Sequence, residues 1–179
     1  NGSVALRLAL IACGVRPGDE VIIPPYTFIA TSTIVLEANC VPVFVDIDPR
    51  TLGMHPDKIL AAITERTRAV FLTHVQGFDG LEDRLLNELQ QRRVQLIEDV
   101  CESHGATHHG RKLGSFGWIS NFSFYYAHHM STIEGGMICT NDQEVYQQVR
   151  MLRSHGMVRE ATDPAVQGAY RSANPELNP

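Results

Sequence analysis

Two adjacent histidines, His128 and His129, stand in the segment of least ordinary composition, Ser123 to Gly136. They follow an aromatic run typical of a strand and precede a Glu-Gly-Gly turn. Histidine is the usual proton donor and acceptor near neutral pH. Because neighbouring side chains of an extended segment point to opposite sides, we expect at most one of the two to face a given site.

An acidic pair, Glu98-Asp99, begins at the end of the apolar run Val94–Ile97. A carboxylate at the end of a buried strand either caps the next helix or holds a cation. One such cation is the protonated ring nitrogen of pyridoxal phosphate, which an acid keeps charged in enzymes that use this cofactor.

The three residues Asn1-Gly2-Ser3 stand directly before a helical pattern. Glycine, a hydroxyl group and the free N–H groups of a helix start can together bind an anion. The same residues also suit an ordinary helix cap, so an anion site is indicated only if other phosphate-binding or cofactor-binding groups converge there.

A zinc site is an alternative use of the histidines. The candidate ligands are Cys101, His104, His108, His109, His128 and His129. Cys101-x-x-His104 and His104-x-x-x-His108 resemble known ligand spacings. We expect no metal site, because the acids and glycine-rich turns around these residues have a better explanation, given below.

Short apolar runs alternate with helical patterns. The expected strands are Glu20–Pro24, Pro42–Asp46, Ala69–Thr73, Val94–Glu98, Ile119–Phe124 and Gly136–Thr140. The expected helices are Ser3–Cys13, Thr27–Ala38, Pro56–Ile63, Leu81–Arg92 and Asp142–Ser154. This alternation predicts an α/β fold whose mainly parallel sheet is buried between helices on both faces. Ligands of such sheets bind at the carboxyl ends of the strands.

The composition suits one globular domain, with 179 residues of which 44% are hydrophobic. A net charge of −5 argues against nucleic acid as a partner, and no apolar run is long enough for a membrane span. The four cysteines show no Cys-x-x-Cys pair, so we expect reduced thiols in a cytoplasmic protein. Only two of the fifteen cationic residues are lysines, Lys58 and Lys112, and both lie in polar surface patterns.

Several blocks in order resemble the DegT-type nucleotide-sugar aminotransferases, a family of fold-type-I pyridoxal-phosphate enzymes. The blocks are Asn1–Ser3, Arg16–Thr31, Pro42–Pro49, Glu98–Asp99 and Phe122–Phe124. The resemblance extends to about Gly156 and implies a three-layer α/β sandwich. It implies that residues 1–160 are a large domain that binds pyridoxal or pyridoxamine 5'-phosphate and lacks its leading segment. Residues 161–179 would then be a linker toward a missing small C-terminal domain.

The resemblance also implies a set of cofactor-binding residues. They are Gly2, Ser3, Phe28, Asp99, Glu102 and Ser123. The first two lie in the family's phosphate loop, and Ser123 helps to hold the phosphate. Phe28 stacks on the cofactor ring and Asp99 meets its pyridine nitrogen. Glu102 falls at a polar position on the cofactor side, where the family often has Gln or His.

The sequence departs from the family pattern at His128. Family aminotransferases place the lysine that binds the cofactor covalently four residues after the Phe-Ser-Phe strand, and an asparagine follows it. Here His128 and His129 occupy those positions. A histidine there resembles the sugar 3-dehydratase branch, which removes the hydroxyl group at carbon 3 of a nucleotide-linked 4-keto-6-deoxyhexose. In that branch His128 would be the catalytic base, because histidine moves protons but forms no stable imine.

The resemblance implies a homodimeric lyase of deoxysugar biosynthesis that serves the lipopolysaccharide O-antigen. A nucleotide sugar would be the substrate and glutamate the co-substrate; an iron–sulfur subtype is disfavoured because the cysteines form no cluster pattern. The alternatives are an aminotransferase that uses glutamate as amino donor, with a lysine supplied elsewhere, a relative that only binds or senses, and a zinc-binding module. We expect the isolated 179 residues to bind cofactor poorly and to show no turnover.

Overall fold

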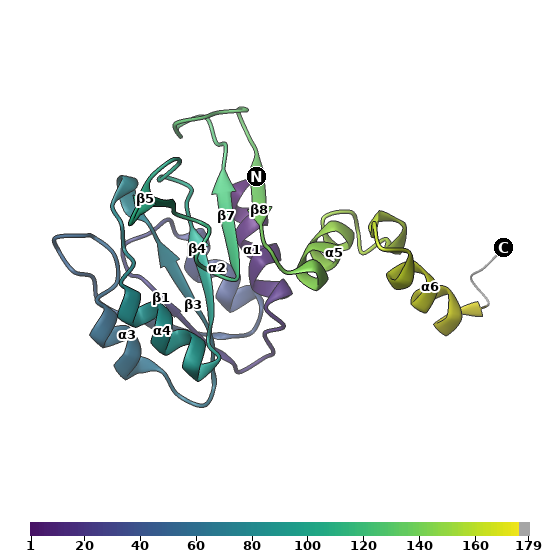
Figure 1. Ribbon diagram of the computed structural model, residues 1–179, viewed down its shortest axis with the longest axis horizontal. Helices are drawn as coiled ribbons and strands as arrows, with labels where there is room; N and C mark the ends of the chain where they lie inside the picture. Colours follow the sequence, from purple (N-terminus) through teal and green to yellow (C-terminus); the bar gives the residue numbers. More distant parts are fainter. Residues whose placement is uncertain (176–179) are drawn as a thin grey trace. The chain divides into compact units, whose positions relative to one another are not determined.

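The computed structural model describes residues 1–175, which divide into two compact units, the second beginning at Asn141. The first unit is built on a six-stranded sheet (Figure 1). In spatial order its strands are β2 (Val41–Phe44), β1 (Glu20–Ile23), β3 (Thr67–Thr73), β4 (Gln95–Asp99), β7 (Ile119–Ser123) and β8 (Gly136–Cys139). All neighbours are parallel except β7 and β8. This confirms the predicted α/β fold with a mainly parallel sheet.

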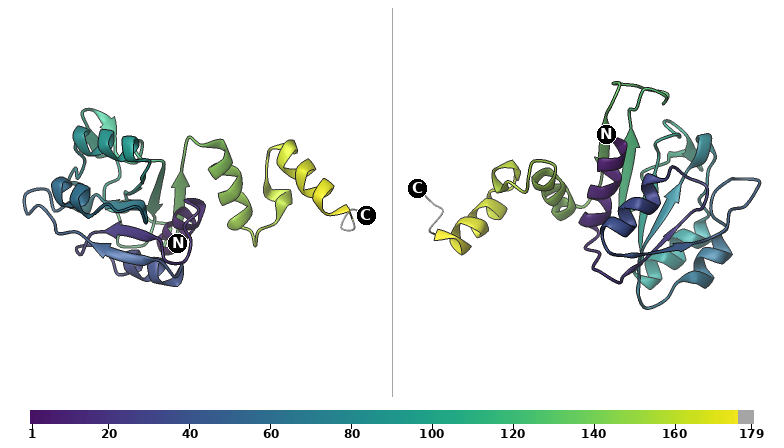
Figure 2. Two further views of the ribbon diagram at one scale, coloured as in Figure 1. Left: turned by 90° about the horizontal axis from the view of Figure 1, so that it is seen from below. Right: turned by 180° about the vertical axis from the view of Figure 1, so that it is seen from behind.

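Two layers of helices enclose the sheet. The helices are α1 (Gly2–Ala12), α2 (Ala30–Glu37), α3 (Pro56–Ala62) and α4 (Asp83–Arg92). Figure 2 shows α1 and α2 on one face of the sheet and α3 and α4 on the other. Buried aliphatic side chains fill both interfaces: Leu6 and Leu10 of α1 and Leu85 and Leu89 of α4 are at most 4% exposed. Burial of this kind contributes about 1.5–3 kcal/mol for each large aliphatic side chain.

Register aligns the residues at the carboxyl ends of the central strands. Thr73 of β3 pairs with Asp99 of β4, and Asp99 pairs in turn with Asn121 of β7. A row of polar side chains therefore crosses the edge of the sheet at which ligands of parallel sheets bind.

Helix α2 begins three residues later than predicted, at Ala30 instead of Thr27. The Thr27 hydroxyl group lies 3.1 Å from that of Thr31 and 3.2 Å from that of Thr73. These contacts hold Thr27 against the end of β3, outside the helix. The residues before Ala30 consequently form a loop beyond the end of β1.

A hairpin and a short turn complete the first unit. The hairpin consists of β5 (Thr107–His108) and β6 (Arg111–Lys112), and η1 is a 3₁₀ turn over Val75–Gly77. Within residues 1–175, no helix is long and apolar enough to cross a membrane.

The second unit contains α5 (Gln143–Leu152), the 3₁₀ turn η2 (Val158–Glu160) and α6 (Pro164–Ala173). Helix α6 lies in the segment for which the sequence analysis predicted only a linker. Asp163 caps it by accepting a hydrogen bond from the N–H of Ala165 at 2.8 Å, and Pro164 follows as the first helical residue. An Asp-Pro start is a recognised helix signal. The proline-rich and asparagine-rich composition of the tail favoured a linker instead.

Candidate active site

A cavity of about 610 Å³ opens at the carboxyl ends of β1, β3, β4 and β7 and at the start of α1. The seven site residues predicted from the sequence all line it: Gly2, Ser3, Phe28, Asp99, Glu102, Ser123 and His128. They come from four separate parts of the chain, so the fold brings together residues as far apart as the first helix and the loop after β7.

The start of α1 forms one end of the cavity. Asn1 caps the helix, its Oδ1 accepting a hydrogen bond from the N–H of Val4 at 2.9 Å. A Cβ on Gly2 would lie 2.7 Å from the Cβ and Oγ of Ser123, so only glycine lets this serine sit against the helix start. The N–H groups at the start of α1, the Ser3 hydroxyl and the Ser123 hydroxyl thus form a donor set that suits a phosphate.

Asp99 supplies the negative charge of the cavity. Its side chain is 5% exposed, and its Oδ1 accepts hydrogen bonds from the N–H of Cys101 and the Nδ2 of Asn121, each at 3.1 Å. Burial raises the pKa of Asp99 above its ordinary value, although these hydrogen bonds oppose the rise. Within residues 1–175, no arginine or lysine pairs with this carboxylate. The arrangement suits a cationic ligand atom, such as a protonated pyridine nitrogen.

Phe28 offers an apolar face to the same cavity. It stands in the loop that Thr27 anchors to β3, and it is 71% exposed although it is a large aromatic residue. A planar ring can stack on such a side chain. The phosphate donors, the acid and the aromatic face together fit pyridoxal phosphate or pyridoxamine phosphate.

The two histidines after β7 have different surroundings. His128 is half-buried and lines the cavity; its N–H donates to the carbonyl of Tyr125 at 3.0 Å, and its ring lies edge-on to the Tyr125 ring. His129 is exposed and does not line this cavity; its ring lies edge-on to that of His104, with centroids 5.9 Å apart. His128 and Glu102 also border a neighbouring hollow of about 390 Å³, which His129 lines.

Neither lysine reaches the cavity. Lys58 Nζ binds the Asp46 carboxylate at 2.7 Å, and Lys112 Nζ donates to the carbonyl of Gly105 at 3.0 Å. His128, at the position where the family has its lysine, therefore lines the cavity while both lysines of the chain are bound elsewhere.

The structure brings together two of the six zinc ligands considered from the sequence, His108 and His109, and places Cys101 and His104 elsewhere. Cys101 lines the cavity, with its Sγ 3.2 Å from Asn121 Nδ2, and burial raises the pKa of its thiol. The His104 ring stacks against Phe122 and Phe124. Among the described residues, the one group spaced to hold a metal ion is Asp83, His108 and His109.

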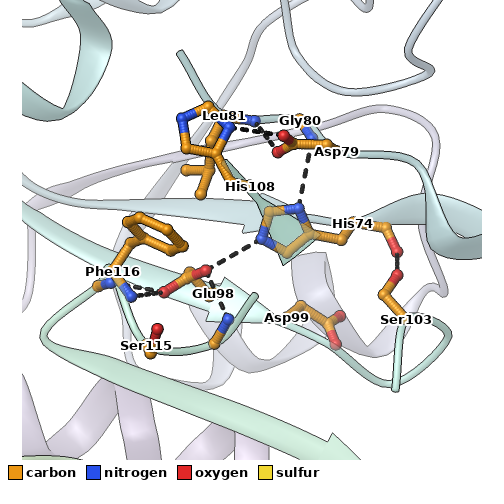
Figure 3. A network of polar contacts seen from close by, with 12 residues as sticks. His74, Asp79, Gly80, Leu81, Glu98, Asp99, Ser103, His108, Ser115 and Phe116 are labelled. Carbon is orange, nitrogen blue, oxygen red and sulfur yellow. Dashed lines mark hydrogen bonds and ion pairs between the residues drawn. The ribbon is translucent and has the colours of Figure 1, made fainter. Parts of the chain in front are cut away.

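A network of polar contacts lies behind Asp99 and was not predicted from the sequence (Figure 3). Glu98 is fully buried, and its carboxylate accepts three backbone N–H hydrogen bonds of 2.5–2.7 Å from residues 114–117. His74 Nε2 lies 3.2 Å from the same carboxylate. Burial opposes ionisation of Glu98, but these hydrogen bonds outweigh it and lower its pKa. The available signals were a histidine directly after β3 and the two glycines of the 114–117 loop, but neither has a local pattern that predicts a contact with Glu98.

Known proteins resemble the chain over most of its length. It is 42% identical to a GDP-perosamine synthase of Caulobacter vibrioides over 176 residues, which is 97% of this chain and 47% of that protein. An aminotransferase structure from Psychrobacter cryohalolentis has 37% identity and a TM-score of 0.84, covering 87% of this chain and 40% of that one. An Escherichia coli GDP-4-keto-6-deoxy-D-mannose-3-dehydratase structure with bound hydrated PLP has 34% identity and a TM-score of 0.83, covering 88% and 42%.

The chain thus spans less than half the length of each of these relatives. The model of the DegT/DnrJ/EryC1/StrS aminotransferase family matches residues 1–175. By this match and by these identities, the chain belongs to the DegT/DnrJ/EryC1/StrS family of aminotransferase-like enzymes, whose cofactor is pyridoxal or pyridoxamine phosphate.

Proposed function

We propose that this protein is a lyase that removes the carbon 3 hydroxyl group of a nucleotide-linked 4-keto-6-deoxyhexose, with pyridoxamine phosphate as cofactor. The observation that supports this most directly is His128. It lies on the cavity wall with Asp99 and Ser123, while both lysines are bound elsewhere.

The cavity residues have separable tasks in this reaction. The start of α1, Ser3 and Ser123 bind the phosphate, Phe28 packs against the ring, and Asp99 keeps the ring nitrogen protonated. When bound, the cofactor supplies an amine that reacts with the sugar ketone and a ring that accepts electrons. Because the cofactor is held without a covalent bond to the chain, these contacts determine its affinity.

His128 moves the protons. In its neutral form, one ring nitrogen accepts the proton released next to the reacting amine, and the resulting imidazolium can protonate the departing hydroxyl group. General acid–base catalysis of this kind contributes about 10²–10⁴-fold to a rate. The contact with Tyr125 fixes the backbone at His128 and so limits where its ring can lie.

A second candidate function is a nucleotide-sugar aminotransferase with glutamate as amino donor. Its support is the 42% identity to a GDP-perosamine synthase and the match to an aminotransferase family. It requires a primary amine in the cavity, and within residues 1–175 the two lysines are both engaged outside it.

The same proposal includes the reaction partners. We propose that glutamate regenerates the pyridoxamine form, that the enzyme works as a cytoplasmic homodimer, and that its product enters O-antigen synthesis. Phe28 and Tyr126, which are 71% and 68% exposed, are apolar surface that a second subunit could cover. The chain of residues 1–160 would then be the cofactor domain of each subunit.

Product mass tests the proposal. The full-length enzyme that contains this chain is incubated with pyridoxamine phosphate, glutamate and a panel of 4-keto-6-deoxy nucleotide sugars, beside His128→Lys and its matched control His129→Lys. We expect a product that lacks the carbon 3 oxygen from the wild type and from H129K, and none from H128K. A product of the wild type that has gained an amine would establish the aminotransferase instead.

A further inference from the structure

A second cluster of polar side chains lies at the β5–β6 hairpin, outside the cavity. His108 and His109 come from the hairpin, Asp83 from the first turn of α4, and Asp79 from the loop before that helix. None of the four lines the cavity.

The turn of the hairpin places the two histidines side by side. His109 and Gly110 both have positive φ, +49° and +80°, as in the two-residue turns that close tight hairpins. This conformation costs a non-glycine residue about 1–2 kcal/mol. It brings the His109 ring to 4.2 Å from the His108 ring, centroid to centroid.

Each imidazole faces a carboxylate. His108 is buried, with Nδ1 2.6 Å from Asp79 and Nε2 3.1 Å from Asp83. His109 Nε2 lies 3.3 Å from the other oxygen of Asp83. The ligand atoms that Asp83, His108 and His109 offer all lie within 4.8 Å of one another.

These separations suit a tetrahedral ion. Zinc bonds of about 2.0–2.1 Å to nitrogen and oxygen place neighbouring ligand atoms roughly 3.3 Å apart. One oxygen of Asp83 already lies 3.1 Å from His108 Nε2, and the other oxygen lies 3.3 Å from His109 Nε2, so the carboxylate is close to both nitrogens. The His109 side chain is 73% exposed, so it can turn the short remaining way toward His108.

The charges also favour a cation. Two carboxylates meet two imidazoles, and within residues 1–175 no arginine or lysine forms an ion pair with Asp79 or Asp83. The nearby Arg84 pairs with Asp57, and Arg111 lies over the Phe116 ring.

We propose that His108 Nε2, the Asp83 carboxylate and His109 Nε2 bind one Zn²⁺ ion, with water as the fourth ligand. Asp79 accepts the Nδ1–H of His108 and so directs Nε2 to the metal, which is the usual carboxylate–histidine–zinc arrangement. The proton that Nε2 shares with Asp83 in the metal-free protein is released when zinc binds.

The ion would act through the fold. It ties the hairpin to the start of α4 and fixes Asp79, whose neighbour Gly80 donates its N–H to His74 Nδ1 at 3.4 Å. His74 in turn contacts Glu98 (Figure 3). The ion would therefore stabilise the network behind the cavity without contacting the cofactor.

Zinc titration of the chelator-treated, cofactor-loaded full-length enzyme tests this, with calorimetry for affinity and elemental analysis for stoichiometry. We expect one ion per chain, and at least tenfold weaker binding by His109→Ala and by Asp83→Asn. Asp79→Asn should weaken binding by about 10–100-fold, as loss of an orienting carboxylate does.

The matched control is His155→Ala. His155 is also exposed, also has a positive φ (+61°) and also precedes a glycine with positive φ, but it lies in the second unit. We expect H155A to bind zinc like the wild type. Equal losses in H155A and H109A, no zinc in the wild type, or unchanged binding by H109A because zinc sits at His128 and His129, would each overturn the proposal.

Discussion

Glu98 and Asp99 are neighbours on β4 and both are buried acids, yet their surroundings shift their pKa values in opposite directions. Successive side chains of a strand point to opposite sides. Glu98 points into packed protein, where three N–H groups and His74 surround it and lower its pKa. Asp99 points into the cavity, where burial raises its pKa and two hydrogen bonds offset it only in part.

The difference separates a residue that holds the fold from one that serves a ligand. A buried carboxylate with a full set of donors is stabilising because its charge is compensated inside the protein. A buried carboxylate without a cation is a cost to the folded protein, which a cationic ligand removes. Mutations on the cavity side of β4 should therefore change mainly the activity, and mutations on the packed side should change mainly the stability.

The largest expected effect lies on the cavity side, at His128. His128→Asn should lower dehydration turnover by about 10²–10⁴-fold, because it removes the proton-transfer group, and should leave the melting temperature nearly unchanged. Steady-state kinetics and thermal melts measure both. His129→Asn is the matched control. If H129N loses as much turnover as H128N, His128 is not the specific proton-transfer group.

On the packed side, Glu98→Gln should destabilise the protein by about 1–3 kcal/mol, the range for leaving buried hydrogen-bond donors without their acceptor. The new amide would also direct N–H groups at the backbone donors of residues 114–117. Denaturant unfolding measures the change. If E98Q unfolds like the wild type while its turnover collapses, Glu98 belongs to the cavity side.

The sequence predicted the cavity better than the network that supports it. Phe28, Asp99 and His128 could be recognised because a family motif or a strand end marks each of them. Their convergence follows from parallel strands whose carboxyl ends share one edge.

The supporting contacts could not be predicted because they join distant segments without a local pattern. His74 reaches Glu98 and Gly80 only once β3, β4 and the loop before α4 are packed. In the same way, Asp83 could not be recognised from the sequence as a neighbour of His108, because the two residues lie 25 positions apart. The local spacing of Cys101 and His104 gave no indication of this contact.

Asp99→Asn should stabilise the cofactor-free protein, whereas Glu98→Gln should destabilise it. Removing the uncompensated charge should stabilise the cofactor-free protein by about 1–3 kcal/mol, since a buried polar group with incomplete hydrogen bonding costs this much. That corresponds to about 2–4 °C in melting temperature per kcal/mol. The same variant should lose the stabilisation that added pyridoxamine phosphate gives the wild type, and a lower melting temperature of cofactor-free D99N would contradict the comparison.

The smallest effect is the pH dependence that distinguishes the two acids. The folded-state pKa of Glu98 lies below its ordinary value of 4.5, so its stabilisation is present above that pH and is lost as the pH falls through the lowered pKa. The folded-state pKa of Asp99 lies above 3.8, so its cost is present at neutral pH and disappears as the pH falls through the raised pKa. In cofactor-free protein melted from pH 7 to pH 4, the stability gain of D99N over the wild type should therefore shrink with falling pH, while most of the deficit of E98Q should persist until the pH drops below about 4.5. Parallel curves for the two variants would mean that both carboxylates are equally compensated, and the distinction between the two sides of β4 would then be wrong.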